Sequence, residues 1–130
     1  MTPFPVVLGL TICEKALVEE GTKNVSLIST FTKIVVGEFP SLPQRFVLYT
    51  VLTGGLGDGT MDLVIRHLET NREIYTNRFQ VHFSDRVAEV RLLVRVKRCS
   101  FPFPEEYLLT LILDGEWLAH RRLRVVAREA

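Results

Sequence analysis

Residues 106–125 read Glu106-Tyr-Leu-Leu-Thr-Leu-Ile-Leu-Asp-Gly-Glu-Trp-Leu-Ala-His-Arg-Arg-Leu-Arg-Val125. The segment predicts a strand at 106–113 and a return strand at 117–127. Between them lies Asp114-Gly115, a dipeptide that tolerates positive φ at both central positions of a hairpin turn. Such a turn matches the twist of the flanking strands, so the segment predicts a β-hairpin. Its two-residue period guides the interpretation of the rest of the chain.

Apolar segments recur along the chain between turn signals, at the spacing typical of sandwiches and barrels. In the clearest of them Val94 and Val96 face one way while Arg95 and Lys97 face the other. We therefore expect an all-β, antiparallel β-sandwich of about seven to eight strands, in one domain spanning residues 1–130. The predicted strands are 6–18, 24–36, 46–53, 61–69, 73–83, 87–98, 106–113 and 117–127.

Charge and composition narrow the class of protein. The chain has 16 lysines and arginines against 15 aspartates and glutamates, a formal charge of +1. This balance argues against a protein that wraps polyanions, so we expect no nucleic-acid partner. The apolar stretch 6–13 is too short to span a bilayer, and prolines precede it where a signal peptide would carry positive charge. We expect a cytoplasmic protein without a membrane partner.

The predicted loops fall at two ends of the sandwich if consecutive strands alternate in direction. Loops 19–23, 53–60, 84–86 and 114–116 share an acidic, glycine-rich end. Loops 37–44, 70–72 and 99–104 share an end rich in proline and phenylalanine. Because sandwiches carry function on clustered loops, this asymmetry is the best clue to a working surface.

The glycine-rich end supplies an alternative function. Its loop Thr53-Gly-Gly-Leu-Gly-Asp-Gly-Thr60 has the glycine content of a phosphate-binding loop, but a strand follows it rather than Lys-Ser/Thr and a helix. We expect a flexible hairpin loop there. The alternative is a calcium or small-ligand site, with solvated turn carboxylates as the simpler interpretation. The carboxylates that would converge in such a site are Glu19, Glu20, Asp58, Asp85 and Asp114.

Reactive side chains form no recognisable catalytic motif. His67, His82 and His120 lie on different predicted strands, with no two at metal-ligand spacing. Cys13 and Cys99 are expected to be buried or idle thiols, although a disulfide between them is an alternative. A nucleophilic cysteine paired with a histidine is a further alternative, but no family signature frames either cysteine. We therefore expect no enzymatic activity, no cofactor and no bound metal.

We expect a non-catalytic module that binds a protein partner through its proline- and phenylalanine-rich loops or through a sheet face. Rigid prolines present aromatic rings at low entropic cost. The alternative for the phenylalanines is that they plug the open end of the sandwich. The residues expected to contact the partner are Phe39, Pro40, Pro43, Phe101 and Phe103.

Outward apolar residues predict self-association. Leu93, Leu108 and Ile112 are large and apolar on strand faces that a lone sandwich would expose to water. We expect a homodimer, formed sheet to sheet with two-fold symmetry. The alternative is that terminal residues 1–5 or 126–130 fold over these side chains.

A set of turn and core motifs extends over nearly the whole chain. They are Thr22-Lys23 before Ser26-Leu27-Ile28, Phe39-Pro40, Leu52-Thr-Gly-Gly55, Phe101-Pro-x-Pro104-x-x-Tyr107 and Leu113-Asp-Gly-Glu-x-Leu-Ala-x-Arg121. Together they resemble a family of small single-domain bacterial proteins of unknown function, with glutamates at 105 and 106 in place of an expected glycine. The resemblance implies an immunoglobulin-like β-sandwich and leaves the function open.

Overall fold

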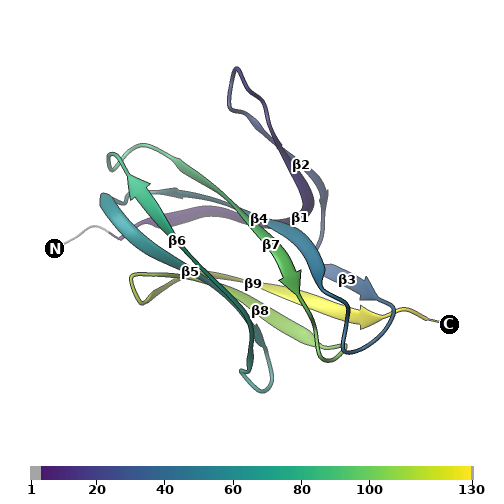
Figure 1. The fold of residues 1–130 in the computed structure, drawn as a ribbon. Helices are drawn as coiled ribbons and strands as arrows, with labels where there is room; N and C mark the ends of the chain where they lie inside the picture. Colours follow the sequence, from purple (N-terminus) through teal and green to yellow (C-terminus); the bar gives the residue numbers. More distant parts are fainter. Residues whose placement is uncertain (1–3, 130) are drawn as a thin grey trace.

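The computed structural model describes residues 4–129, which form two facing β-sheets (Figure 1). The strand order is β2-β1-β4-β7 in one sheet and β3-β9-β8-β5-β6 in the other. The predicted all-β sandwich is confirmed, with nine strands within the described residues. They are β1 (Val6–Val18), β2 (Val25–Thr30), β3 (Lys33–Val36), β4 (Gln44–Thr53), β5 (Gly57–His67), β6 (Glu73–Phe83), β7 (Val90–Cys99), β8 (Glu106–Leu113) and β9 (Glu116–Ala127). None of residues 4–129 belongs to a helix with the length and apolar character needed to cross a membrane.

The segment 24–36, predicted as one strand, forms two strands in different sheets. β2 pairs antiparallel with β1, whereas β3 pairs in parallel with β9. The Phe31 N–H donates to the Ile12 carbonyl of β1 at 2.9 Å. One residue later the Thr32 carbonyl accepts from the Arg124 N–H of β9, also at 2.9 Å. The chain therefore changes sheets between Phe31 and Thr32, which raises the strand count and adds a parallel pair to an otherwise antiparallel prediction.

The turn at 19–23 does not lie at the glycine-rich end, contrary to the prediction. β1 runs antiparallel to β4, with Val6 opposite Thr53 and Cys13 opposite Val47, so β1 ends where β4 begins. Figure 1 shows the β1–β2 hairpin rising away from the body of the sandwich. The prediction is wrong because 24–36 contains two strands of opposite direction and not one, so the β1–β2 turn lies at the other end.

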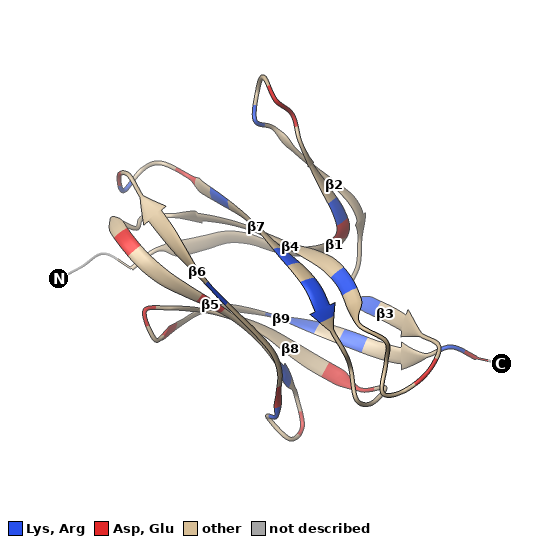
Figure 2. Ribbon diagram, viewed as in Figure 1, with Lys and Arg blue, Asp and Glu red and all other residues tan. Residues whose placement is uncertain are grey.

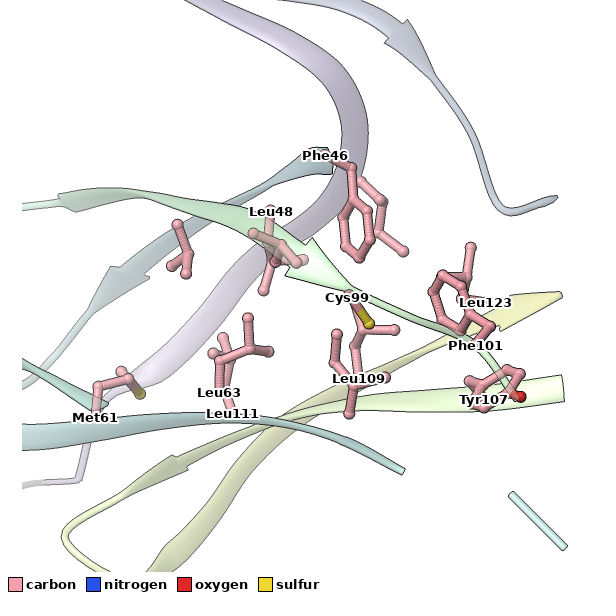
Figure 3. Packing of buried hydrophobic residues seen from close by; sticks show 14 of the residues in the cluster. Phe46, Leu48, Met61, Leu63, Cys99, Phe101, Tyr107, Leu109, Leu111 and Leu123 are labelled. Carbon is pink, nitrogen blue, oxygen red and sulfur yellow. The ribbon is translucent and has the colours of Figure 1, made fainter. Parts of the chain in front are cut away.

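Alternate residues of the facing strands fill the space between the sheets (Figure 3). The predicted period of two is confirmed for β7, where Val94 and Val96 are buried while Arg95 and Lys97 are exposed. The predicted turn between β8 and β9 is also confirmed, since Asp114 and Gly115 both have positive φ, at 48° and 83°. Buried core residues from β4, β5 and β8 include Phe46, Leu48, Leu52, Met61, Leu63, Ile65, Tyr107, Leu109, Leu111 and Leu113.

Four strands form the edges of the two sheets: β2 and β7 in the first, β3 and β6 in the second. The outward face of β7 carries the exposed side chains of Arg91, Arg95 and Lys97. Figure 2 shows basic residues on β3, β4, β7 and β9. The edge strand β7 is therefore strongly positive on its outer side.

Tyr107 ties down the connection between β7 and β8. Its hydroxyl donates to the Phe103 carbonyl at 2.9 Å and accepts from the Phe103 N–H at 3.2 Å. The Tyr107 residue is fully buried, and its one side chain satisfies both backbone groups of Phe103. This arrangement, a tyrosine at the start of a strand bonded back to the preceding loop, is a tyrosine corner.

Replacing Tyr107 with phenylalanine removes the hydroxyl and keeps the ring. We expect Tyr107→Phe to lower the free energy of unfolding by about 1–3 kcal/mol, because the two backbone groups of Phe103 lose their partner. Denaturant unfolding followed by fluorescence measures this change. Tyr49→Phe, on the outer side of the other sheet, is the control, and equal losses for the two variants would contradict the role of the corner.

Candidate interaction site at the proline- and phenylalanine-rich end

Ser41 joins the two proline-rich loops, 37–43 and 100–105. The Ser41 N–H donates to the Phe101 carbonyl at 2.9 Å. In return the Ser41 hydroxyl oxygen accepts from the Phe101 N–H at 2.8 Å. Ser41 is itself buried. The two loops therefore lie at the same end of the sandwich, as the sequence predicts, and hold each other in place.

Phe101 points into the core and is not available to a partner. Its exposed fraction is 0%, and its ring packs edge-on against that of Tyr107 at 4.9 Å between centroids. Phe39 is half-buried and packs against the same core. The prediction that Phe101 contacts a partner is wrong, because the open end of the sandwich needs a large apolar side chain to exclude water. For Phe101 the alternative of a plug is confirmed.

The other predicted contact residues remain accessible at this end. Pro40 and Pro43 are exposed, and Phe103 is 37% exposed. Between the two prolines lies Leu42, which the sequence did not single out and which is 66% exposed. The sequence around an isolated leucine in a loop does not indicate whether the side chain is exposed or buried, so sequence reasoning does not identify Leu42.

His67 is a buried residue at the end of β5 whose two ring nitrogens both have partners. Nδ1 lies 2.7 Å from Thr70 Oγ1, and Nε2 lies 2.7 Å from Glu105 Oε2. The rings of Phe103 and Tyr107 pack against the imidazole, with centroids at 5.2 and 5.4 Å. Both ring nitrogens of His67 therefore have a partner, and its neighbours fix the orientation of the ring.

Glu105 is a site residue that the sequence did not reveal as a partner of His67. The two residues are 38 positions apart. Their contact follows from the register of β5 with β8, in which His67 lies opposite Tyr107, two residues after Glu105. The register of β5 against β8 is therefore the signal that identifies this contact.

An open groove of about 630 Å³ lies beside His67, and we call it the acidic groove. Leu68, Pro104 and Val126 give it apolar walls. Its charged groups are three glutamates and one arginine, so its rim is net negative. The complete lining is Leu68, Glu69, Pro104, Glu105, Glu106 and residues 124–127.

The carboxylates of the glycine-rich end do not converge on a common point. Asp114 accepts from the Thr60 N–H at 2.9 Å, and Asp85 accepts from two N–H groups of its own turn. Glu19 and Glu20 belong to the β1–β2 turn, which the pairing of β1 with β4 places elsewhere. Within the described residues the five carboxylates do not come together as the alternative of a calcium site requires, although Asp58 and Asp114 both line a groove at this end.

The glycine-rich loop connects the two sheets and is not the hairpin that the sequence predicts, because β4 and β5 belong to different sheets. Gly54 has a φ of 89°, and a Cβ at Gly55 would lie 2.8 Å from the ring of Phe83. Backbone conformation and close packing thus account for these two glycines. In β5 itself, Asp58 faces the exposed His82, with Oδ1 2.6 Å from Nδ1.

The three residues of the predicted dimer surface do not share a face. Leu93 lies on β7 in one sheet, whereas Leu108 and Ile112 lie on β8 in the other. The prediction of a single patch is wrong, because strands that follow each other in sequence need not be neighbours in a sheet. Trp117 of β9 lies opposite Ile112 and is 55% exposed. The outer apolar group, defined as Leu108, Ile112 and Trp117, therefore belongs to the five-stranded sheet.

The alternative to a dimer is that residues 1–5 or 126–130 fold over these apolar side chains. Both segments lie only partly within the described residues. Residues 1–3 and 130 are outside them. Phe4 and Pro5 line a separate groove at the glycine-rich end, with Gly55 and Phe83. Val126 lines the acidic groove.

Cys13 and Cys99 are free and buried, as the sequence predicts. Burial raises the pKa of the Cys99 thiol to about 12, and burial also raises that of Cys13. Only the thiolate is a strong nucleophile. Neither cysteine is therefore in an environment that favours reaction.

The two facing sheets and the tyrosine corner define an immunoglobulin-like β-sandwich. The chain belongs to DUF6941, a family of unknown function whose model matches residues 8–126. A search of the curated proteins finds no match.

Two solved structures are similar to this chain at low sequence identity. One is the alkylpurine DNA glycosylase AlkC of Pseudomonas fluorescens, bound to DNA containing an abasic site analog, with a TM-score of 0.55 and 14% identity. The match covers 93% of this chain and 30% of the glycosylase, so the chain spans less than a third of that enzyme. An immunoglobulin-like protein from Pseudomonas aeruginosa has a TM-score of 0.44 and 12% identity, with 94% of this chain and 96% of that chain covered. At such identities the glycosylase match concerns the fold alone.

Alanine substitutions should separate the plug from the surface at this end. We expect Phe101→Ala to lower the free energy of unfolding by about 3–5 kcal/mol, since it leaves a cavity in the core. Phe103→Ala removes a half-exposed ring that packs on His67, for which we expect about 1 kcal/mol. Urea unfolding of both variants measures the difference. Similar losses of unfolding free energy in the two variants would contradict a buried Phe101 and an exposed Phe103.

Proposed function

We propose that the protein is a non-catalytic interaction module that binds a protein partner through the acidic groove. The observation that carries this proposal is the groove itself, an apolar depression with a net negative rim. Its volume of about 630 Å³ lies within the range of pockets that accept ligand-sized groups. A partner segment with one apolar side chain flanked by lysine or arginine fits this chemistry.

The surroundings of the acidic groove support binding because they are already ordered. Ser41 links the two loops, and Tyr107 fixes the loop that carries Pro104. Glu105 is held by His67 at 2.7 Å. A surface that is rigid before binding loses little conformational entropy when a partner arrives.

Two further considerations support a protein partner over a substrate or a nucleic acid. The buried thiols, with their raised pKa values, are poorly suited to nucleophilic catalysis. The glutamates of the groove would repel a phosphate backbone. We also propose a cytoplasmic location, which the two free thiols support because disulfides are rare in that compartment.

Peptide selection against the purified protein tests the acidic groove. We expect enriched sequences with an apolar residue next to lysine or arginine, and Glu106→Arg should weaken their binding at least ten-fold. Glu20→Arg on the β1–β2 turn makes the same charge change away from the groove and should leave binding unchanged. A short DNA duplex should not compete. Equal effects of the two substitutions, or competition by DNA, would contradict the proposal.

We also propose that the outer apolar group forms a homodimer contact. Trp117 is more than half exposed beside Ile112, and exposed tryptophans are enriched among residues that dominate binding energy at interfaces. Leu108 continues the same face of β8 and is half-buried. Two copies related by two-fold symmetry would cover these side chains.

Light scattering at micromolar concentration checks the homodimer. We expect a dimer for the unmodified protein and a monomer for Trp117→Glu, because a buried charge at the contact opposes association. Val87→Glu is the matched control, since Val87 is 86% exposed in the β6–β7 connection and lies off this face. A monomeric unmodified protein would refute the dimer.

A further inference from the structure

His67, Glu69 and Glu105 form a cluster of potential metal ligands at the proline- and phenylalanine-rich end. One potential ligand atom from each of these described residues lies within 4.8 Å of the other two. The three side chains come from the end of β5, the β5–β6 turn and the β7–β8 connection. We propose that these residues bind a Zn²⁺ ion.

The imidazole of His67 is placed as zinc-binding histidines are placed. Its Nδ1 lies 2.7 Å from the Thr70 hydroxyl and also accepts from the Thr70 N–H at 3.3 Å, so without a metal the ring proton lies on Nε2, towards Glu105. A zinc ion at Nε2 would displace this proton, and the Thr70 hydroxyl can accept the proton that Nδ1 then carries. A hydrogen bond at the remote ring nitrogen orients the ligand and raises its basicity in metal sites. The rings of Phe103 and Tyr107 both pack against the imidazole. The ligand is thus oriented before a metal arrives.

The two carboxylates can close around an ion at Nε2. Glu105 Oε2 already lies 2.7 Å from Nε2, where a shared proton would give way to the metal. Zn²⁺ binds nitrogen and oxygen at about 2.0–2.2 Å, so tetrahedral ligands lie about 3.4 Å apart. Glu69 is exposed, and the Glu105 side chain is 43% exposed, so both can move the short distance required. Both also line the acidic groove, from which an ion can enter.

The donor set selects zinc over the harder cations. Calcium requires about six to eight oxygen ligands, and magnesium retains its waters in octahedral geometry. One imidazole with two carboxylates suits Zn²⁺, with a fourth position open to water or to a partner's side chain. A divalent cation would also offset the glutamates of the groove, where Arg124 is the basic residue in the lining.

Zinc is not required for folding, because hydrogen bonds satisfy both nitrogens of His67 without it. We therefore expect reversible binding that stabilises a protein already folded. The inference does not depend on a protein partner, since the three ligands come from this chain alone.

Zinc chloride titrated into the reduced protein tests the site by calorimetry and by thermal unfolding. We expect zinc to raise the melting temperature by several degrees, since a ligand that binds the native state stabilises it. Calcium and magnesium at the same concentration should not. Glu69→Gln should lower zinc affinity at least ten-fold, whereas Glu20→Gln should change it less than two-fold. Glu20→Gln is the matched control because Glu20 is an exposed glutamate on the β1–β2 turn, outside both the cluster and the groove.

Imidazole ¹⁵N spectra identify the histidine that binds. Zinc should shift the Nε2 resonance of His67 and leave those of His82 and His120 unchanged. The two exposed histidines thus serve as internal controls, and His82 has a carboxylate neighbour of its own in Asp58. The absence of zinc stabilisation, unchanged affinity in Glu69→Gln, or shifts confined to His82 and His120 would each overturn the proposal.

Discussion

The hydrogen bonds between the Tyr107 hydroxyl and the backbone of Phe103 are the constraint on which the proline- and phenylalanine-rich end depends. They fix the β7–β8 connection, so that Phe101 enters the core while Phe103 packs on His67. Ser41 then attaches the second loop to the first. The positions of the exposed loop residues therefore depend on Tyr107, a buried side chain that is inaccessible to a partner.

Local patterns were sufficient to predict the strands but not their assignment to sheets. The final hairpin and the alternation of β7 follow from residue type and a period of two, both of which act over short distances. The change of sheet between Phe31 and Thr32 has no such signal, because both halves of 24–36 are rich in residues that favour strands. The end predicted for the 19–23 turn is wrong for the same reason.

The candidate site was predictable only in part, for a similar reason. Proline and phenylalanine marked the correct loops, yet the same sequence pattern suits a plug and an exposed surface. Whether Phe101 or Phe103 is buried depends on side chains from other strands. The pairing of His67 with Glu105 depends on the register of β5 against β8, which tertiary packing decides. Predicting contacts of this kind requires the strand pairing and its register, which no local sequence motif contains.

The positive outer face of the edge strand β7 affects the tendency of the protein to associate edge to edge at high concentration. An unpaired edge offers backbone groups to any other strand, including the same strand of a second copy. Arg91, Arg95 and Lys97 would then meet their own counterparts across the new pairing. Like charges in cross-strand positions destabilise such a pair. The repulsion opposes polymerisation of the sandwich along this edge while leaving the edge open to a strand of opposite charge.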